Sequence, residues 1–276
     1  EISFHVNVDG AVTATAQLVQ LIHGDAHPDG PGHLEREIDN PINGIWQVTK
    51  QFTQLGNFLT VEDPDQNLKL EGAFTMFCHI WPTMPKKGVR QTIMGRWDTL
   101  TNEGFALGIS PQGYLEFWVG DGKEVDYITA ELPLMTRVWY FVGISYDPKS
   151  GISTLYQEGT LNRYNSIVGP VAPYDFSSHV ETKFRFRNKN RADIPFLIGG
   201  ARDNHTLRGP FVNDLYAGKF DRPCVCNQVM NRSQMDGFAA GKRPKQDQIV
   251  AYWDTSKGLD DEGMGHTILD TGPYGL

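Results

Sequence analysis

The sequence lacks the features that mark several large classes of protein. Its 276 residues include only three cysteines, an odd number that argues against a disulfide framework and favours reduced thiols. No stretch reaches the roughly 20 apolar residues that a membrane-spanning helix needs, and no signal-peptide pattern opens the chain. Lys and Arg total 25 against 33 Asp and Glu, and this net charge of −8 disfavours nucleic-acid or anionic-membrane partners. We therefore expect a cytoplasmic protein that binds neither nucleic acid nor membrane.

Motifs of common catalytic and metal sites are also missing. The sequence contains no GxSxG, HExxH, P-loop or GxGxxG pattern. Cys224 and Cys226 are separated by one residue, whereas zinc-binding cysteine pairs usually have about two to four residues between them. Because alternate residues of a strand share a face, we interpret this pair as neighbouring packed thiols rather than as zinc ligands.

Short runs of alternating apolar and polar residues are abundant. Between Gly104 and Gly159 five such runs are separated by turn residues, for example at Gly120–Gly122 and Asp147–Gly151. This pattern is typical of an antiparallel meander. With 39% hydrophobic residues the chain is also long enough to bury a full core. We predict an all-β protein built as a two-sheet antiparallel sandwich with one short helix.

We divide the chain into three regions. Residues 1–50 form a short β segment, residues 51–222 form the sandwich, and residues 223–276 carry the helix and a returning strand. The helix is predicted to begin with an N-cap near Ser233 and to end before Gly241. The predicted strands are Ile2–Val8, Thr13–Leu21, Asn57–Glu62, Ala73–Trp81, Gln91–Trp97, Phe105–Ile109, Tyr114–Val119, Val125–Ala130, Val138–Tyr146, Ser153–Gln157, Phe184–Arg187, Ile194–Gly199, Leu215–Phe220 and Ile249–Asp254.

The segment Ile22–His33 is the first candidate site. It is rich in residue types that ligate transition metals or act as general bases, namely His23, Asp25, His27, Asp29 and His33. Its prolines and glycines turn the chain, and aspartates in turns hydrogen-bond to their own backbone. We therefore predict a shaped docking loop, with a metal or general-base site as the alternative.

The sandwich region resembles a laminin G-like, concanavalin A-like jelly roll. The resemblance rests on an ordered series of loose motifs over about 170 residues: FTMFCHIWPT, RW, GFALGIS, GYLEFWVGDG, VWYFVGISYDPKSGISTLYQEG, FLIGGA and FVNDLYAGKFDRP. It implies two antiparallel sheets stacked face to face. It also implies a calcium site built from carboxylates at strand ends, for which Asp121 and Asp126 are candidates, with Trp118 as a ligand-stacking residue. Hairpin turns for the aspartates and core packing for Trp118 are the alternative interpretation.

The flanks resemble a narrower family. The runs LVQLIHGDAHPDGPGHLEREI, IVAYWDTSKGL and ILDTGPYGL are similar to the amino-terminal part of the large (beta) subunit of N,N-dimethylformamidase and related amide hydrolases. That resemblance implies a fragment cut from a longer polypeptide whose later catalytic domain binds iron. No residue of this chain matches the iron ligands, so we expect no catalytic residue and no cofactor here.

These observations lead to one main expectation and two alternatives. We expect a non-catalytic accessory domain that assembles with its own C-terminal catalytic domain and with a small subunit or a second copy. The first alternative is a carbohydrate- or ligand-binding lectin-like module, with or without calcium. The second is a free-standing glycosidase, which needs two facing acids, whereas the run YLEFW offers only Glu116.

Overall fold

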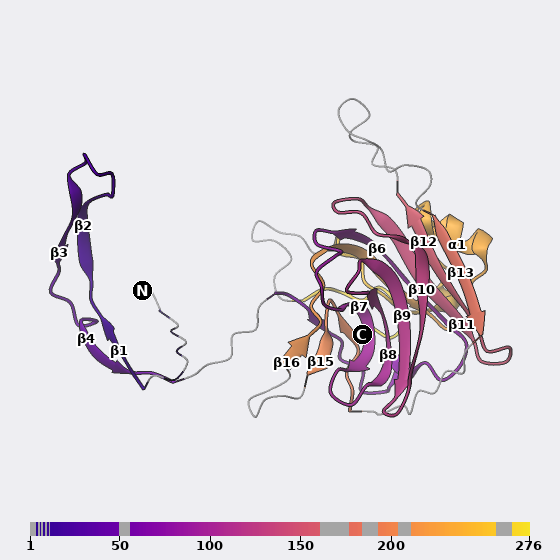
Figure 1. The fold of residues 1–276 in the computed structure, drawn as a ribbon. Helices are drawn as coiled ribbons and strands as arrows, with labels where there is room; N and C mark the ends of the chain where they lie inside the picture. Colours follow the sequence, from indigo (N-terminus) through magenta and orange to yellow (C-terminus); the bar gives the residue numbers. More distant parts are fainter. Residues whose placement is uncertain are drawn as a thin grey trace. The chain divides into compact units, whose positions relative to one another are not determined.

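The chain forms two compact units, Glu1–Leu55 and Gly56–Leu276 (Figure 1). The computed structural model describes residues 4, 6, 8, 10, 12–49, 56–160, 177–183, 193–203, 211–257 and 267–276. None of the helices in these ranges has the length and apolar character that crossing a membrane requires.

The first unit consists of two small antiparallel sheets. Strand β1 (Thr13–Ala16) pairs with β4 (Gly44–Gln47), and β2 (Val19–Asp25) pairs with β3 (Gly32–Glu37). The predicted strand Thr13–Leu21 is therefore two strands, and the predicted loop Ile22–His33 is mostly a hairpin. Sequence reading missed this because the register shifts between Leu21 and His23, which breaks the alternation. The predicted strand Ile2–Val8 lies largely outside the described residues.

The second unit is an antiparallel jelly-roll sandwich, as predicted. One sheet has the order β10-β9-β8-β7-β14-β5, with β15 and β16 attached beside β7, and the other has the order β13-β12-β11-β6-β17-β18. Their bounds are β5 Leu59–Thr60, β6 Phe74–Pro82, β7 Gln91–Asp98, β8 Glu103–Ile109, β9 Tyr114–Asp121, β10 Val125–Pro133, β11 Tyr140–Asp147, β12 Ile152–Gly159, β13 Ser178–Lys183, β14 Leu197–Ile198, β15 Ala201–Asp203, β16 Phe211–Asn213, β17 Gly218–Cys226 and β18 Ile249–Tyr252. The helices within the described residues are η1 (Asn67–Lys69), α1 (Arg232–Ala239) and η3 (Gln246–Gln248).

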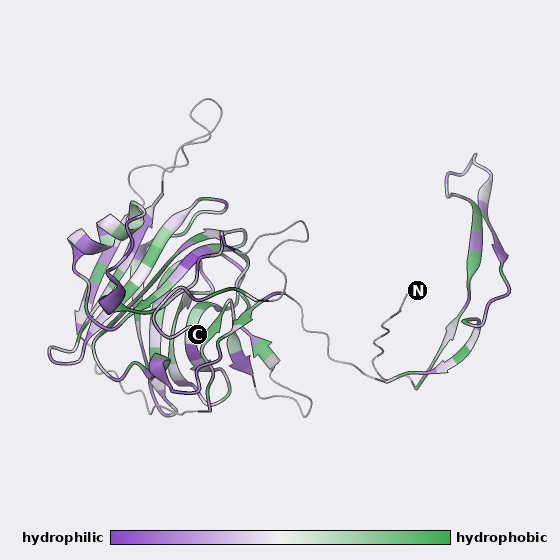
Figure 2. Ribbon diagram, turned by 180° about the vertical axis from the view of Figure 1, so that it is seen from behind, coloured by the Kyte–Doolittle hydropathy of each residue, from purple (hydrophilic) through white to green (hydrophobic). Residues whose placement is uncertain are grey.

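The core lies between the two sheets because alternate strand residues point to opposite faces. In β6, Phe74, Met76, Cys78 and Ile80 are fully buried in this core. The Phe74 ring packs against Phe105 at 5.8 Å between ring centroids. Figure 2 shows the result as hydrophobic and hydrophilic residues alternating along the strands. The intervening residues of β6 therefore face outward, where a second layer can form.

Several boundaries differ from the prediction. The predicted border at residue 222 falls inside β17, which pairs with both β6 and β18, so residues 223–226 belong to the sandwich. The helix is capped by Asn231 rather than Ser233, because the Asn231 side chain accepts from Gln234 N at 3.0 Å. The predicted strand Phe184–Arg187 lies outside the described residues, and β13 was not predicted.

The Asp270 carboxylate helps to tie the last residues to the sandwich. Asp270 Oδ1 accepts from the backbone N–H groups of Tyr252 and Gly272, both at 2.7 Å, and its Oδ2 accepts from Leu276 N at 3.0 Å. The Trp253 indole also donates to Leu276 O at 3.2 Å. The C-terminal segment is thus fixed to β18.

Candidate functional site

The predicted docking loop is the exposed tip of the β2–β3 hairpin, and its polar groups are engaged locally. His23 Nδ1 lies 2.7 Å from Gly32 O, Asp25 Oδ1 accepts from His27 N at 2.9 Å, and His33 Nε2 lies 3.1 Å from Glu35 Oε2. Asp29 donates its backbone N–H to His27 Nδ1 at 3.2 Å. Contacts of this kind, in which polar side chains bond to nearby backbone groups, are typical of turns. The docking role of this segment stays a prediction.

The candidates for calcium or ligand binding do not converge. Asp121 Oδ1 accepts from Lys123 N and Glu124 N, which closes the β9–β10 hairpin. Asp126 is paired with Val119 in the sheet, so it shares the face of Val119 and points away from the face of Trp118. Trp118 is fully buried, and a ligand cannot stack on an indole that has no exposed surface. The interpretation of Trp118 as a ligand residue is therefore corrected to core packing.

Glycines make the room for that packing. A Cβ at Gly108 would lie 2.4 Å from Trp118 Cη2, closer than real Cβ contacts. Trp97 stands edge-on to Trp118 with ring centroids 6.2 Å apart, and the Arg90 guanidinium covers Trp118 at 4.8 Å. Nearby Glu116 is also buried and accepts from Thr129 Oγ1 at 3.0 Å. Burial raises its pKa, but among the described residues it has no facing acid in this cluster.

The outer face of the six-stranded sheet carries a second apolar layer under α1. Phe77 and Phe141 from β6 and β11 pack against Met235 and Phe238 of the helix. The Phe77 and Phe238 rings stack with centroids 5.1 Å apart. The capping box of Asn231 and Gln234 starts the helix at the place where these apolar residues can reach the sheet. A pocket adjoins this layer, and Tyr156 and Ala239 belong to both.

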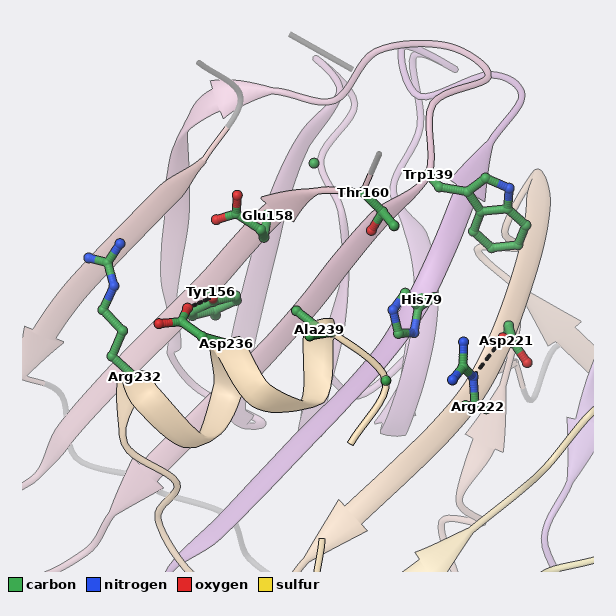
Figure 3. A pocket seen from close by; sticks show the side chains of 13 residues that line it. His79, Trp139, Tyr156, Glu158, Thr160, Asp221, Arg222, Arg232, Asp236 and Ala239 are labelled. Atoms are coloured by element: carbon green, nitrogen blue, oxygen red, sulfur yellow. Dashed lines mark hydrogen bonds and ion pairs between the residues drawn. The ribbon is translucent and has the colours of Figure 1, made fainter. Parts of the chain in front are cut away.

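The pocket beside α1 has a volume of about 930 Å³. It is lined from four elements and from the segments next to them, by His79 of β6, Trp139 before β11, Tyr156, Glu158, Gly159 and Thr160 of β12 and its end, Asp221 and Arg222 of β17, and Arg232, Asp236, Ala239, Ala240 and Gly241 of α1 and its end. Figure 3 shows two groups of these side chains with Thr160 and Ala239 between them: one group is Arg232, Asp236, Tyr156 and Glu158, and the other is His79, Trp139, Asp221 and Arg222. Sequence analysis did not identify this site.

His79 brings a buried imidazole to one end of the pocket. Its side chain is 7% exposed, and its Nδ1 is buried without a hydrogen-bond partner in the part of the chain that the structure describes. The ring stands edge-on to Phe141 with centroids 5.2 Å apart. Burial, and then the charge of Arg222, lower the pKa of His79, against smaller effects of a backbone hydrogen bond with Ala239 and of Asp221. The fold therefore favours the neutral form of His79.

At the other end, aromatic and acidic groups are already paired. The Tyr156 hydroxyl donates to Asp236 Oδ1. His179 of β13 stands over Tyr156 at 4.2 Å between ring centroids, and its Nε2 lies 3.7 Å from Glu158 Oε2. Burial, and then the charge of Arg232, lower the pKa of His179. This end of the pocket is fixed by side-chain contacts between β12, β13 and α1.

One sequence signal for this site was available. In FTMFCHIWP the alternation places His79 on the outer face, together with Thr75 and Phe77, so the imidazole is expected outside the core between the sheets. The pair Asp221-Arg222 before Pro223 was a weaker signal. Its partners in β6 and β12 come from segments more than 60 residues away in sequence, which no local pattern reveals.

The first unit presents a contrasting surface. A groove of about 490 Å³ is lined mainly by apolar residues, among them Phe4, Ala16, Ile42 and Val48, with Trp46 on its wall. Trp46 is 49% exposed, and its indole N–H is fixed by Ile42 O at 2.7 Å. This hydrogen bond satisfies the polar atom of the Trp46 ring and fixes the ring's orientation. The exposed apolar face of the ring is available for contact with a partner.

The histidine-rich segment and the acidic residues supply the candidate metal ligands of this chain. Among the described residues, no group of three or more His, Cys, Asp or Glu side chains is placed to hold a metal ion. The iron expected for a larger parent protein stays a prediction, and we assign it no ligand among the described residues.

Comparisons with known proteins give three results. Residues 55–231 match the family described as the Concanavalin A-like lectin/glucanases superfamily. N,N-dimethylformamidase beta subunits from Alcaligenes sp and Paracoccus aminophilus are 32% and 30% identical to this chain over 91% and 95% of its length. The chain spans 33% and 34% of those relatives, about a third of their length.

A solved structure from Bacteroides ovatus ATCC 8483, described as a carbohydrate binding protein, shares the fold. It is 20% identical with a TM-score of 0.53, and the match covers 78% of this chain and 53% of that one.

Proposed function

The chain belongs to the Concanavalin A-like lectin/glucanases superfamily, and on that premise we propose that it is the accessory, non-catalytic region of a larger amide hydrolase similar to N,N-dimethylformamidase. The observation that carries this proposal is how much of each protein the alignment covers. Nearly the whole chain aligns with only a third of each beta subunit, so two thirds of each relative have no counterpart in it. The reaction and its iron would belong to that remainder.

The surface of the first unit supports an assembly role. None of its described residues is buried, and its strands expose Leu21 by 58%, Leu34 by 50% and Ile45 by 75%. Two-stranded sheets are marginally stable in water unless they pack against something else. We propose that the Trp46 groove and these strands dock onto the polypeptide that corresponds to the remaining two thirds of the relatives. A small subunit or a second copy is the other partner that we expect for the whole enzyme.

The cellular setting is part of this proposal. All three cysteines, Cys78, Cys224 and Cys226, are free and buried. Buried thiols persist in the reducing cytoplasm, which supports a cytoplasmic location.

A direct test compares the complete reading frame that contains this chain with residues 1–276 alone. We expect release of dimethylamine from N,N-dimethylformamide, and bound iron, only with the complete polypeptide. Activity of residues 1–276 alone, or a complete polypeptide without amidase activity, would contradict the proposal.

Hydrogen exchange then tests the docking surface. In the complete polypeptide the amides of β1 and β4 should exchange more slowly than in residues 1–276, because docking protects them. Trp46→Ala should remove this protection, whereas Tyr127→Ala, at an aromatic residue of the second unit that is 63% exposed, should leave it unchanged. Equal exchange in both proteins would exclude docking through this unit.

A second candidate function is supported by the pocket beside α1. A ligand-binding module should have a polar pocket with an accessible aromatic residue, and here Trp139 is partly exposed at the edge of such a pocket. The carbohydrate- or ligand-binding alternative therefore applies to the second unit and does not depend on docking through the first.

A further inference from the structure

The His79 end of the pocket contains two polar groups that the fold positions and leaves incomplete. The first is His79 Nδ1, which is buried without a partner among the described residues. The second is the guanidinium of Arg222. In Figure 3 both side chains point into the same end of the opening, below Trp139.

Arg222 is oriented by its neighbour. Its Nε donates to Asp221 Oδ2 at 2.8 Å, and Asp221 Oδ1 in turn accepts from Thr255 Oγ1 at 2.8 Å. In the described part of the chain the two Nη atoms of Arg222 have no hydrogen-bond partner. A guanidinium held through Nε presents its two terminal nitrogens as a preformed pair of donors.

The backbone of β17 is distorted at this place. The pairing of β17 with β6 shifts register between Asp221 and Cys224, and Arg222 has φ of 49°, a left-handed value that is uncommon outside glycine. A bulge re-aims side chains, and here it lets the consecutive residues Asp221 and Arg222 line the same pocket. Strained backbone conformations cluster at binding sites, and they persist where the surrounding structure holds them in place.

We propose that this end of the pocket binds a carboxylate group, with the two Nη donors of Arg222 on its oxygens and His79 Nδ1 as a third partner. A planar carboxylate matches the spacing of two guanidinium N–H groups, which a hydroxyl does not. Trp139 offers a flat apolar surface for the remainder of the ligand. The proposal specifies the ligand chemistry of the second candidate function and is independent of docking through the first unit.

The surrounding charges favour this assignment. Asp221 is already engaged with Arg222 and Thr255, and Asp236 of α1 accepts from Tyr156. Glu158 of β12 faces His179, while Arg232 of α1 adds positive charge to the far end. The charge of Arg222 has a larger effect on the pKa of His79 than the charge of Asp221 has, and Asp254 also acts on Arg222. The guanidinium is the positive group that an arriving anion would meet.

Carboxylate binding should be coupled to proton uptake. The positive charge of Arg222 contributes to the lowered pKa of His79, and a bound anion offsets that charge. The pKa of His79 is therefore higher in the complex than in the free protein, and a proton is taken up on binding. Affinity should rise as the pH falls from 8 to 6.

The first experiment uses benzoate and its uncharged analogue benzamide, titrated into residues 1–276 by calorimetry. We expect benzoate to bind. Benzamide should bind at least about tenfold more weakly, because it is uncharged and has one oxygen instead of two to accept from the guanidinium donors. Calorimetry in buffers of different ionisation enthalpy should show proton uptake. Equal affinity for the two probes, or no binding of benzoate, would overturn the proposal.

Two substitutions locate the site. Arg222→Lys keeps the charge but removes the paired donors, and it should weaken benzoate binding about tenfold. Arg137→Lys is the matched control, because Arg137 is another arginine with a left-handed φ, 62°, and lies exposed outside the pocket. His79→Gln should abolish the proton uptake while the circular dichroism spectrum stays unchanged. Full binding and proton uptake in both pocket variants would place the carboxylate elsewhere.

The source of the carboxylate is tested with two further probes. A short peptide ending in Phe with a free C-terminus is compared with the same peptide as its amide. Binding of the free acid alone identifies a peptide carboxylate as an occupant, and binding of benzoate but neither peptide identifies a small free acid. Binding of neutral saccharides in place of every acid would overturn the proposal in favour of a lectin site.

Discussion

The two units of this chain handle apolar residues in opposite ways. In the second unit, two sheets and a helix bury apolar residues in two layers, and Phe74, Phe105 and Phe117 have no exposed surface. The strands of the first unit carry fewer apolar residues, and Ile45 there is 75% exposed. The difference lies in the number of layers as well as in composition. A strand buries a side chain only where a second layer covers that face.

This comparison separates stability from assembly. Residues buried in the second unit contribute to the free energy of unfolding of the chain itself. Apolar residues of the first unit contribute little until a partner covers them. The same type of substitution should therefore have different consequences in the two units.

The largest difference is expected between Phe74→Ala and Ile45→Ala. Phe74 packs between both sheets, so its truncation should lower the free energy of unfolding by about 3–5 kcal/mol. Ile45→Ala should change it by less than about 0.5 kcal/mol in residues 1–276. Urea unfolding followed by circular dichroism measures both, and similar losses for the two variants would break the comparison.

A middle-sized effect is expected at the start of α1. Asn231→Ala removes the side chain that caps the helix and should cost about 1 kcal/mol. Ser233→Ala is the control, because Ser233 lies inside the helix and should change stability by only a few tenths of a kcal/mol. If Ser233→Ala lost more stability than Asn231→Ala, Ser233 would be the N-cap, as the sequence predicted.

The smallest expected effect is on the pH dependence of stability, and it tests the environment of His79 in the buried outer layer. The pKa of His79 is lowered from 6.5 by burial, so below about pH 6.5 the unfolded chain binds a proton that the folded chain resists. Stability should thus fall as the solution is acidified through that range. His79→Gln should flatten the loss between pH 7 and 5 in urea unfolding, while measurement at pH 8 isolates its packing cost. If the stability of His79→Gln fell between pH 7 and 5 as steeply as that of the original chain, His79 would not be held neutral in the fold.

Sequence reasoning worked where one rule decided the structure. The alternation in FTMFCHIW and GYLEFWVG correctly predicted β6 and β9, because each strand has one face in the core. It failed at Ile22–His33, where Pro and Gly suggested a loop although backbone pairing extends to Asp25. The pocket was beyond its reach, since His79 and Arg222 meet only after β6 and β17 pair and a bulge turns Arg222.

The three hydrogen bonds that Asp270 accepts have a mechanical consequence. A pull on Leu276 would be carried through the Asp270 carboxylate and Trp253 directly to β18, at the edge of the six-stranded sheet. Force would then peel β18 from β17 one pair at a time rather than shear the whole sheet. Asp270→Asn, which weakens these bonds, should let the terminal segment extend first, so the force trace would begin with a short early step.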